Sequence, residues 1–521
     1  MSLSTRESPS ARATPRAPLT VGALAPVSLC LCLALALASC ADVSDEPPRR
    51  PNVLFVVADT LRADHLSTYG YGWKTSPRLD ELASRGVTFL DCTAQASWTM
   101  PSMISLMTGQ PIFSTLYRIP GEFPVLAERF EEAGYRTGAF VGNSLLSEEA
   151  GFQRGIDRWA VRQHGGPKWR DGELETRALA FLDDQGGGAA DGPAGDPRGD
   201  AVGGDERPWF LWLQSMITHA PYDPPRIPWR RRPGEVFTEA EQAGIRDVLG
   251  DVDDAQRKTL AGQISDLSAM VDKYDGEVLA LDALIGRLVD ALDERGLLDS
   301  TYIVLVSDHG ETLFSRRQIT TRFEQLRKWR EHRGEPLTLV EYLKMEHDGT
   351  VYEELVRTPF VLAGPGLPAG RREQALVANI DVGPTLLGLC GLSSNLGAGR
   401  DLSGALLRDE PVPDAPWATT SCQQALAAKL PGGRKLVLPR TAVEVGFGLE
   451  PRVYDLRADP EERQPVVGLL GSGEGSDLSR ELVPILGRLE RAAETGPFVP
   501  FSGADADSAT MEKLRELGYV R

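Results

Sequence analysis

The chain has 521 residues, of which 41% are hydrophobic and 25% are charged. This balance is typical of a globular protein with room for a large α/β domain and a smaller one. The formal net charge of −18 argues against nucleic acid as a partner, because binding to phosphate backbones needs a basic surface. Any anion site must therefore be built locally, from a metal ion, a helix N-terminus or a few side chains.

The first 39 residues have the pattern of an export signal. Three arginines precede an apolar run over residues 19–38, and Ser39 and Cys40 follow. This resembles a bacterial lipoprotein signal, in which the cysteine is lipidated after cleavage. The alternative is a single membrane-spanning anchor, because the run is near spanning length. In either case we expect an exported protein held at a cell-envelope membrane, on its periplasmic or extracellular face, with residues 40–50 as a polar tether.

From residue 51 the sequence alternates between strand-like and helix-like segments. Continuous apolar runs predict buried strands, usually of a parallel sheet; they lie at 52–58, 137–142, 209–217, 302–307 and 360–363. Helical spacing of apolar residues predicts helices between and after these strands, at 76–85, 101–107, 123–133, 173–183, 265–295 and 379–389.

This order of elements predicts an α/β fold. We expect a large, mostly parallel sheet flanked by helices over residues 51–400, and a smaller C-terminal α+β subdomain over 401–521, with short strands at 434–438 and 452–456. Residues 185–208 are rich in Gly, Ala, Asp and Pro and predict a disordered insertion. Residues 319–342 predict a basic helix, interpreted as a solvated face, with contact to substrate or lipid headgroups as the alternative.

Two of the predicted strands run straight into acids. Residues 52–58 end at Asp59, and residues 302–307 end at Asp308 and His309. In open α/β sheets the ligand crevice lies beyond the carboxyl ends of the strands, and Asp and His are ligands for hard or borderline divalent cations. A strand that ends in Asp at a turn is an ordinary feature, but the pair, with His309 beside Asp308, indicates a metal site.

A third candidate, Thr99, stands at the start of a predicted helix, two residues before Pro101. The free N–H groups and positive dipole of a helix N-terminus suit a tetrahedral anion. A hydroxyl held there by a metal could lose its proton and attack phosphorus or sulfur. The alternative is a plain N-cap threonine.

Apart from the signal and Cys40, the cysteines are Cys92, Cys390 and Cys422. An odd number without metal-ligand spacing gives no disulfide framework. We interpret Cys390 as a small buried hydrophobic residue, and a bridge between Cys390 and Cys422 in an oxidising compartment stays open.

From residue 51 onward the chain resembles the sulfatase family of the alkaline phosphatase superfamily. The resemblance rests on motifs in the family's order, at 52–64, 75–80, 99–109, 219–222, 307–311, 347–354, 454–461 and 514–520. It implies an alkaline-phosphatase-like α/β fold, hydrolysis of sulfuric or phosphoric esters, and one divalent metal ion as cofactor, either Ca, Mn, Mg or Zn.

Four residues fall on the family's metal positions. By the resemblance, Asp59, Asp308 and His309 are metal ligands, and Thr99 is both a metal ligand and the catalytic nucleophile.

Three further residues are candidates for contact with the substrate. His219 and His347 fall where family members bind the anionic head of the substrate or protonate the leaving oxygen, so both are catalytic and substrate-binding candidates. Asn143 stands near the position of a missing family element and is a third substrate-binding candidate.

Departures from the family pattern narrow the chemistry. The usual sulfatase signature begins with Cys or Ser, which is oxidised to formylglycine, and continues with Pro, Ser and Arg. Here Thr99 stands first, which cannot be oxidised to an aldehyde, and Met103 replaces the arginine. Thr60 replaces a second acid, and the expected Lys-x-His element is missing. The remaining set resembles the phospho-transferring branches of the superfamily.

We therefore expect a metal-dependent hydrolase of sulfate or phosphate esters, with Thr99 as nucleophile and phosphate preferred. The substrate would be a small-molecule, glycan or lipid ester, and the membrane would be reached through lipidated Cys40. Two alternatives stay open. One is an envelope transferase that moves a phospho-headgroup onto a glycan or lipid, and the other is a catalytically degenerate sulfatase-like binding protein.

Overall fold

The computed structural model describes residues 49–112, 116–184, 207–231, 254–313, 347, 350–422, 425–439, 452–462, 464–466 and 485, with side chains of the long helix described from residue 268. The described residues from Arg50 onward belong to one compact unit. The export signal, Cys40, the insertion up to residue 206, the basic helix at 319–342 and the closing motif at 514–520 lie outside the described residues. The boundaries at residues 400 and 401 stay a prediction.

The main sheet has eight strands in the order β4-β3-β5-β1-β6-β7-β2-β8. Most neighbours are parallel, and β7 runs antiparallel to both β6 and β2. The predicted large, mostly parallel sheet is thus confirmed. Its strands are β1 Asn52–Ala58, β2 Gly86–Thr93, β3 Arg136–Val141, β4 Arg158–Val161, β5 Trp209–Ser215, β6 Thr301–Ser307, β7 Arg357–Ala363 and β8 Arg371–Ala378.

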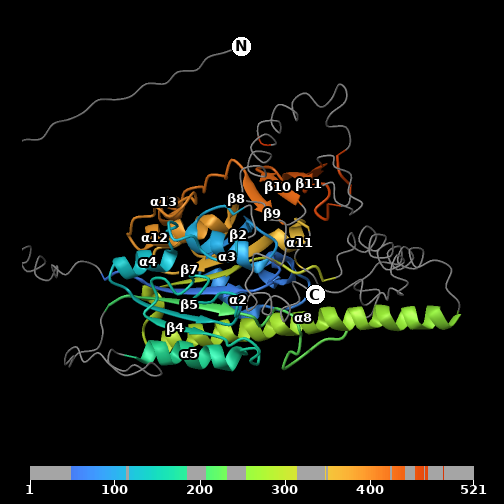
Figure 1. Cartoon of the computed structure of the whole chain (residues 1–521), viewed down its shortest axis with the longest axis horizontal. Helices are drawn as coiled ribbons and strands as arrows, with labels where there is room; N and C mark the ends of the chain where they lie inside the picture. The colour runs from blue at the N-terminus through green and yellow to red at the C-terminus, as the bar shows by residue number, and fades with distance from the viewer. Residues whose placement is uncertain are drawn as a thin grey trace, which may run out of the picture. The chain divides into compact units, whose positions relative to one another are not determined.

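Helices cover both faces of this sheet (Figure 1). Side chains of β1 alternate between two cores, with Phe55 in one and Val56 in the other, which is the period of two that a strand imposes. The Phe55 core includes α3 Thr99–Thr108, α4 Leu126–Glu132, α12 Val382–Leu389 and α13 Ser403–Leu407, and the Val56 core includes α2 Pro77–Ser84, α5 Asp171–Asp183 and α8 Asp254–Glu294. Shorter helical pieces are η1 Ala63–His65, η2 Ser67–Tyr69, η3 Leu298–Ser300, α11 Glu353–Val356 and η4 Asn379–Asp381.

A second sheet follows in the last part of the chain. Its order is β12-β11-β10-β9 and all its pairs are antiparallel; the strands are β9 Ala418–Ser421, β10 Ala425–Leu430, β11 Arg434–Pro439 and β12 Arg452–Asp455. The end of β9 is bonded to the segment before α3, since Ser421 N–H donates to Gln95 O at 2.9 Å and Ser97 N–H donates to Ser421 O at 3.2 Å. The small sheet therefore helps to fix the approach to Thr99.

Some element boundaries differ from the prediction for identifiable reasons. Helix α4 begins at Leu126 rather than at residue 123, because Pro124 disfavours helical backbone at Phe123. The strand β8 was not expected, because its first half alternates between half-buried and exposed polar residues and lies at the sheet edge. The long helix α8 begins at Asp254, eleven residues earlier than its apolar spacing indicates.

The three cysteines of the described chain are all buried, and no disulfide links them. Burial raises the pKa of the Cys390 thiol to about 12, so it stays protonated at neutral pH. The open question of a Cys390–Cys422 bridge is therefore answered in the negative for this structure, and Cys390 packs in the Phe55 core as a small hydrophobic residue.

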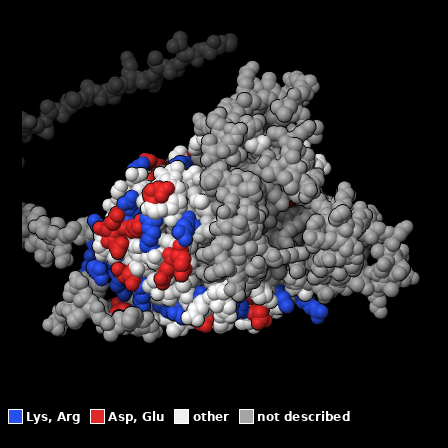
Figure 2. Space-filling model, in the orientation of Figure 1, with Lys and Arg blue, Asp and Glu red and all other residues white. Residues whose placement is uncertain are grey.

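The described surface is polar and mixed in charge. On the face seen in Figure 2, acidic and basic side chains are interspersed. Ion pairs form elsewhere in the described structure as well as in the core, such as that of Arg371 with the exposed Asp409 at 3.1 Å. Within the described ranges, no helix is both long enough and apolar enough to cross a membrane.

A cluster of aromatic rings from β5, α4 and β1 offers a test of the core. Phe210 is fully buried, and its ring centroid lies 4.5 Å from that of Phe130 and 6.2 Å from that of Phe55. We expect Phe210→Ala to lower the free energy of unfolding by about 3–5 kcal/mol, because a cavity replaces the ring. Denaturant unfolding should show at most about 0.5 kcal/mol for Leu407→Ala, a residue that is 45% exposed. Similar losses in both variants would contradict this assignment of the core.

Candidate active site

Three buried side chains converge at the carboxyl ends of β1 and β6. These strands are parallel neighbours with Ala58 opposite Ser307, so the residues that follow them meet at one edge of the sheet. Asp59, Asp308 and His309 each place one ligand atom within 4.8 Å of the others, and all three are buried. His309 Nε2 lies 3.5 Å from Asp308 Oδ2 and 3.7 Å from Asp59 Oδ1.

The two buried carboxylates of Asp59 and Asp308 repel each other when both are charged. Burial, and then the neighbouring Asp59, raise the pKa of Asp308 well above its ordinary value. Asp59 Oδ1 and Asp308 Oδ2 are buried oxygens that accept no hydrogen bond within the described part of the chain. A positive charge between them would remove both problems, because it attracts the two carboxylates and uses their open lone pairs.

The tautomer of His309 suits the same role. His309 Nδ1 lies 2.9 Å from Gly310 O, and because a carbonyl only accepts, Nδ1 carries the proton and Nε2 presents its lone pair toward the acids. Burial, and then His347, lower the pKa of His309 to about 3, so the imidazole is neutral at pH 7. Two open carboxylate oxygens and an imidazole lone pair form a donor set that fits a divalent cation.

Thr99 joins this group from α3. It is the first residue of the helix, and its Oγ1 lies 3.2 Å from His309 Nε2. The helix is buried along its whole length, and Ser102 Oγ donates to Asp308 O at 2.5 Å, which ties the first turn to the end of β6. At the other end, Gly109 has φ 67°, and a Cβ there would lie 2.1 Å from Leu396 O. The helix is thus held at both ends.

Asn143, predicted from the sequence as a substrate contact, lies beside Asp59. Its Nδ2 donates to Asp59 Oδ2 at 2.9 Å, and its Oδ1 accepts from Leu145 N–H at 3.0 Å. Gln214 Nε2 donates to the same Asp59 oxygen at 3.1 Å. Both polar atoms of the Asn143 amide therefore have partners inside the protein. The bonds from Asn143 and Gln214 hold Asp59 Oδ2, which leaves Asp59 Oδ1 for the proposed cation.

The other two histidines lie beside this centre. The His347 ring stacks on His309 at 4.7 Å between centroids, and the His219 ring meets His347 edge-on at 5.3 Å. His219 Nδ1 lies 2.6 Å from Ala220 O, so the neutral ring presents a bare Nε2, which is buried and has no hydrogen-bond partner in the described structure. Burial lowers the pKa of His219.

Two residues that the sequence did not single out support these histidines. Glu311 is buried, and its Oε1 lies 3.5 Å from His347 Nδ1. Burial opposes its ionisation, but His347 holds its pKa below the ordinary value. Lys168 Nζ donates to Ile217 O at 2.8 Å and to His219 O at 2.6 Å, which fixes the loop that carries His219. Glu311 lies inside a recognised motif, whereas no signal marked Lys168.

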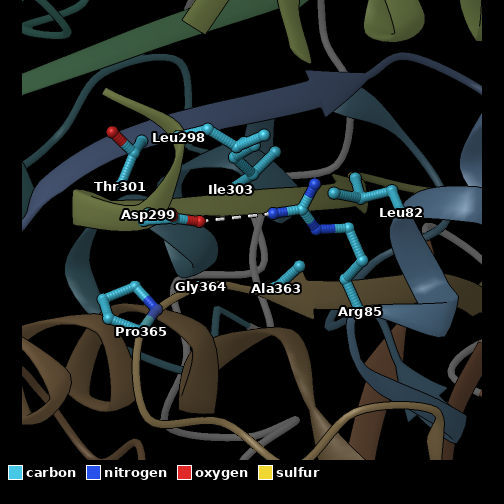
Figure 3. Close-up of a pocket in the computed structure, with 9 residues that line it drawn as sticks. All are labelled: Leu82, Arg85, Leu298, Asp299, Thr301, Ile303, Ala363, Gly364 and Pro365. Atoms are coloured by element: carbon cyan, nitrogen blue, oxygen red, sulfur yellow. Dashed lines mark hydrogen bonds and ion pairs between the residues drawn. The ribbon is translucent and has the colours of Figure 1, made fainter. Parts of the chain in front are cut away.

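A surface pocket at the other end of the sheet is separate from this centre (Figure 3). Residues near the start of β6 and the end of β7 line it, and Arg85 reaches Asp299 across it at 3.5 Å. The pocket lies at the start of β6 and Asp308 follows its end, so the length of the strand, about 20 Å, separates the two. Side chains of Asp299 and Arg85 are 99% and 50% exposed, so their ion pair adds little to stability.

Comparisons with known proteins identify the family of this chain. Residues 51–392 match the family model described as Sulfatase. N-acetylglucosamine-6-O-sulfatase of Bacteroides thetaiotaomicron is 23% identical over 550 aligned positions, which cover 86% of this chain and 88% of that protein. Human arylsulfatase A is 28% identical over 416 positions, covering 69% and 68%.

Solved structures share the fold. A protein in complex with its substrate D-glucosamine-2-N,6-O-disulfate superposes with a TM-score of 0.62 at 19% identity, covering 87% of this chain and 100% of that one. Phosphonate monoester hydrolase of Agrobacterium radiobacter superposes with a TM-score of 0.54 at 20% identity, covering 86% and 96%.

Because the two acids repel each other but would bind a cation together, removal of one should preserve stability without cation and weaken stabilisation by cation. In a chelator, we expect Asp308→Asn to be at least as stable as the wild type, because one of two facing carboxylates is removed. Saturating divalent cation should then stabilise the wild type by about 2.7 kcal/mol at a hundred times its Kd and the variant by much less. Thermal unfolding with and without cation measures both effects.

Asp299→Asn, an exposed acid at the remote pocket, is the matched control and should respond to cation as the wild type does. A cation effect that survives in Asp308→Asn would show that the cation binds elsewhere.

Proposed function

Because this chain belongs to the sulfatase family, we propose that it is a metal-dependent hydrolase of sulfate or phosphate esters in which Thr99 is the nucleophile. The observation that carries the proposal is the position of Thr99 Oγ1, 3.2 Å from His309 Nε2. The same nitrogen lies within 3.7 Å of the open oxygens of Asp59 and Asp308. A divalent cation held by Asp59, Asp308, His309 and Thr99 would supply Lewis-acid stabilisation of negative charge and lower the pKa of the threonine hydroxyl.

The proposed reaction has two steps, the formation of a covalent intermediate on Thr99 and its hydrolysis by water. Thr99 Oγ1 attacks the phosphorus or sulfur of the ester, the new O–P or O–S bond forms, and the bond to the alcohol oxygen breaks. The alcohol leaves with one proton, and Thr99 carries the phosphoryl or sulfuryl group. Water then attacks the same atom, releases the inorganic anion and restores the hydroxyl.

His219 is suited to handling the leaving group. Its Nε2 is buried without a hydrogen-bond partner in the described structure, and burial lowers its pKa, so the free protein holds it neutral at pH 7. A bound anion would raise that pKa by its charge, and the resulting imidazolium can donate its Nε2 proton to the leaving oxygen. His347, with Nδ1 3.5 Å from Glu311, can hold an oxygen of the anionic head.

Thr99 and Met103 favour phosphate over sulfate as the natural ester. Threonine cannot become the formylglycine of the usual sulfatase mechanism, and Met103 is a buried apolar side chain where that mechanism has an arginine. The names of relatives point to sugars, because one is an N-acetylglucosamine-6-O-sulfatase. We therefore propose an ester of a sugar or another alcohol at the cell envelope.

Replacing the nucleophile tests the mechanism. We expect Thr99→Ala to lower metal-dependent hydrolysis of aryl phosphate, aryl phosphodiester or aryl sulfate by at least about 1000-fold, because no hydroxyl is left to form the covalent intermediate. Thr99→Ser keeps a hydroxyl and should keep measurable activity. Cation binding measured without substrate should weaken far less than activity in Thr99→Ala.

The alternatives give different results in the same assay. An envelope transferase would show turnover that rises with an added acceptor alcohol. A degenerate binding protein would turn over none of the three esters with Mn, Mg, Ca or Zn. Full activity in Thr99→Ala would refute Thr99 as nucleophile, and turnover of sulfate alone would refute the phosphate preference.

We also propose that the chain is exported and anchored through lipidated Cys40, on the strength of the basic, apolar and small-residue pattern in residues 1–40. Cys40→Ser removes the thiol that would carry the lipid, so the variant should keep its uncleaved leader and lose the mass of the lipid. Mass spectrometry of membrane fractions measures both changes. A variant without the leader that differs from the wild type only by the exchange of sulfur for oxygen would contradict lipidation.

A further inference from the structure

The turn after β1 holds a non-glycine residue in a costly conformation. Thr60 follows Asp59 and has φ 60°, in the left-handed region that a β-branched residue rarely adopts. A backbone of this kind costs on the order of 1–3 kcal/mol and persists only where its surroundings hold it. Thr60 is also completely buried, so the restraint must come from the protein.

This conformation links the two acids of the site. Thr60 N–H donates to Asp308 Oδ1 at 3.3 Å, which leaves Oδ2 to face the proposed cation. Thr60 Oγ1 lies 2.7 Å from Asp59 O and 2.9 Å from Thr218 O. Relaxation of Thr60 to an ordinary φ would turn its N–H away from Asp308 and alter the chain direction immediately after Asp59.

One side chain from α8 closes this turn from outside. Tyr274 OH donates to Thr60 O at 2.8 Å and accepts from Arg62 N–H at 2.9 Å, so a single hydroxyl bridges the two peptide groups on either side of Leu61. Tyr274 is fully buried. Its ring meets His65 edge-on at 5.1 Å and Tyr222 at 5.4 Å, and this packing fixes where the hydroxyl points.

We propose that Tyr274 is a positioning residue of the metal centre, whose hydroxyl keeps Thr60 in its left-handed conformation and thereby sets the geometry of Asp59 and Asp308. The inference rests on the proposed function, because it assigns the consequence to cation binding at those two acids. Tyr274 does not itself reach the donor set, and its effect passes through the backbone of residues 60–62.

The test removes the hydroxyl and keeps the ring. In the full chain, we expect Tyr274→Phe to weaken the affinity for Mn²⁺, measured by calorimetry without substrate, by about 10-fold, the lower end of the effect of outer residues on metal sites. With excess Mn²⁺, kcat should fall while KM changes little, because the Tyr274 hydroxyl bonds to Thr60 and Arg62 and not to His219 or His347.

Tyr302→Phe is the matched control. Tyr302 is also buried, and its OH donates to a backbone carbonyl, Pro365 O, at 2.9 Å, at the opposite end of the sheet. It should lose a similar amount of stability in denaturant unfolding and bind Mn²⁺ as the wild type does. An unchanged Mn²⁺ affinity in Tyr274→Phe, or an equal loss in both variants, would overturn the inference.

A second variant separates positioning from packing. Glycine adopts a φ of 60° without steric cost, so in a Thr60→Gly background the added effect of Tyr274→Phe on Mn²⁺ affinity should shrink from about 10-fold to less than about 3-fold. Full additivity would overturn the route through Thr60. A wild type that binds neither Mn²⁺ nor Ca²⁺, Mg²⁺ or Zn²⁺ would defeat the proposed function itself, an outcome distinct from an insensitive Tyr274 variant.

Discussion

The geometry of the candidate metal site depends on two buried carboxylates that face each other. Asp59 and Asp308 are carried to one point by parallel neighbours in the middle of the main sheet, where no solvent screens them. Each has one oxygen satisfied by protein donors and one left open toward the other. Such an arrangement is stable only if a cation shares the site or one acid is protonated, and the lone pair of His309 Nε2 favours the cation.

The surrounding bonds keep this arrangement from relaxing. Asn143 and Gln214 both donate to Asp59 Oδ2, and Thr60 N–H donates to Asp308 Oδ1. The hydroxyl of Ser307 accepts from Leu61 N–H at 3.0 Å. If these donors were lost, the open oxygens could turn to find partners within the protein. The hydrogen bonds therefore favour the conformation in which the donor set is ready for an ion.

The small sheet contributes to the same centre from a distance. Lys429 Nζ lies 2.5 Å from both Asp91 and Glu353, and Lys435 Nζ lies 2.9 Å from Glu353. The pairs with Glu353 join β10 and β11 to α11, which follows His347, and the pair with Asp91 joins β10 to β2. Both lysines are buried, so removal of their acidic partners would leave a buried charge unpaired. A Cβ on Gly310 would lie 1.9 Å from Glu354 O, so the glycine beside His309 is what lets this segment approach the site.

The sequence alone determined the class of fold and the centre of the site. Apolar strands running into Asp59 and Asp308 placed both acids at the carboxyl edge of a sheet, and the motif order supplied Thr99, His219 and His347. It could do so because strand periodicity and motif spacing are local properties of the chain. The tertiary structure decided what surrounds them. Asn143 bonds to Asp59 across 84 residues and Tyr274 to Thr60 across 214, and contacts at such separations depend on how helices pack against the sheet, which no local pattern records.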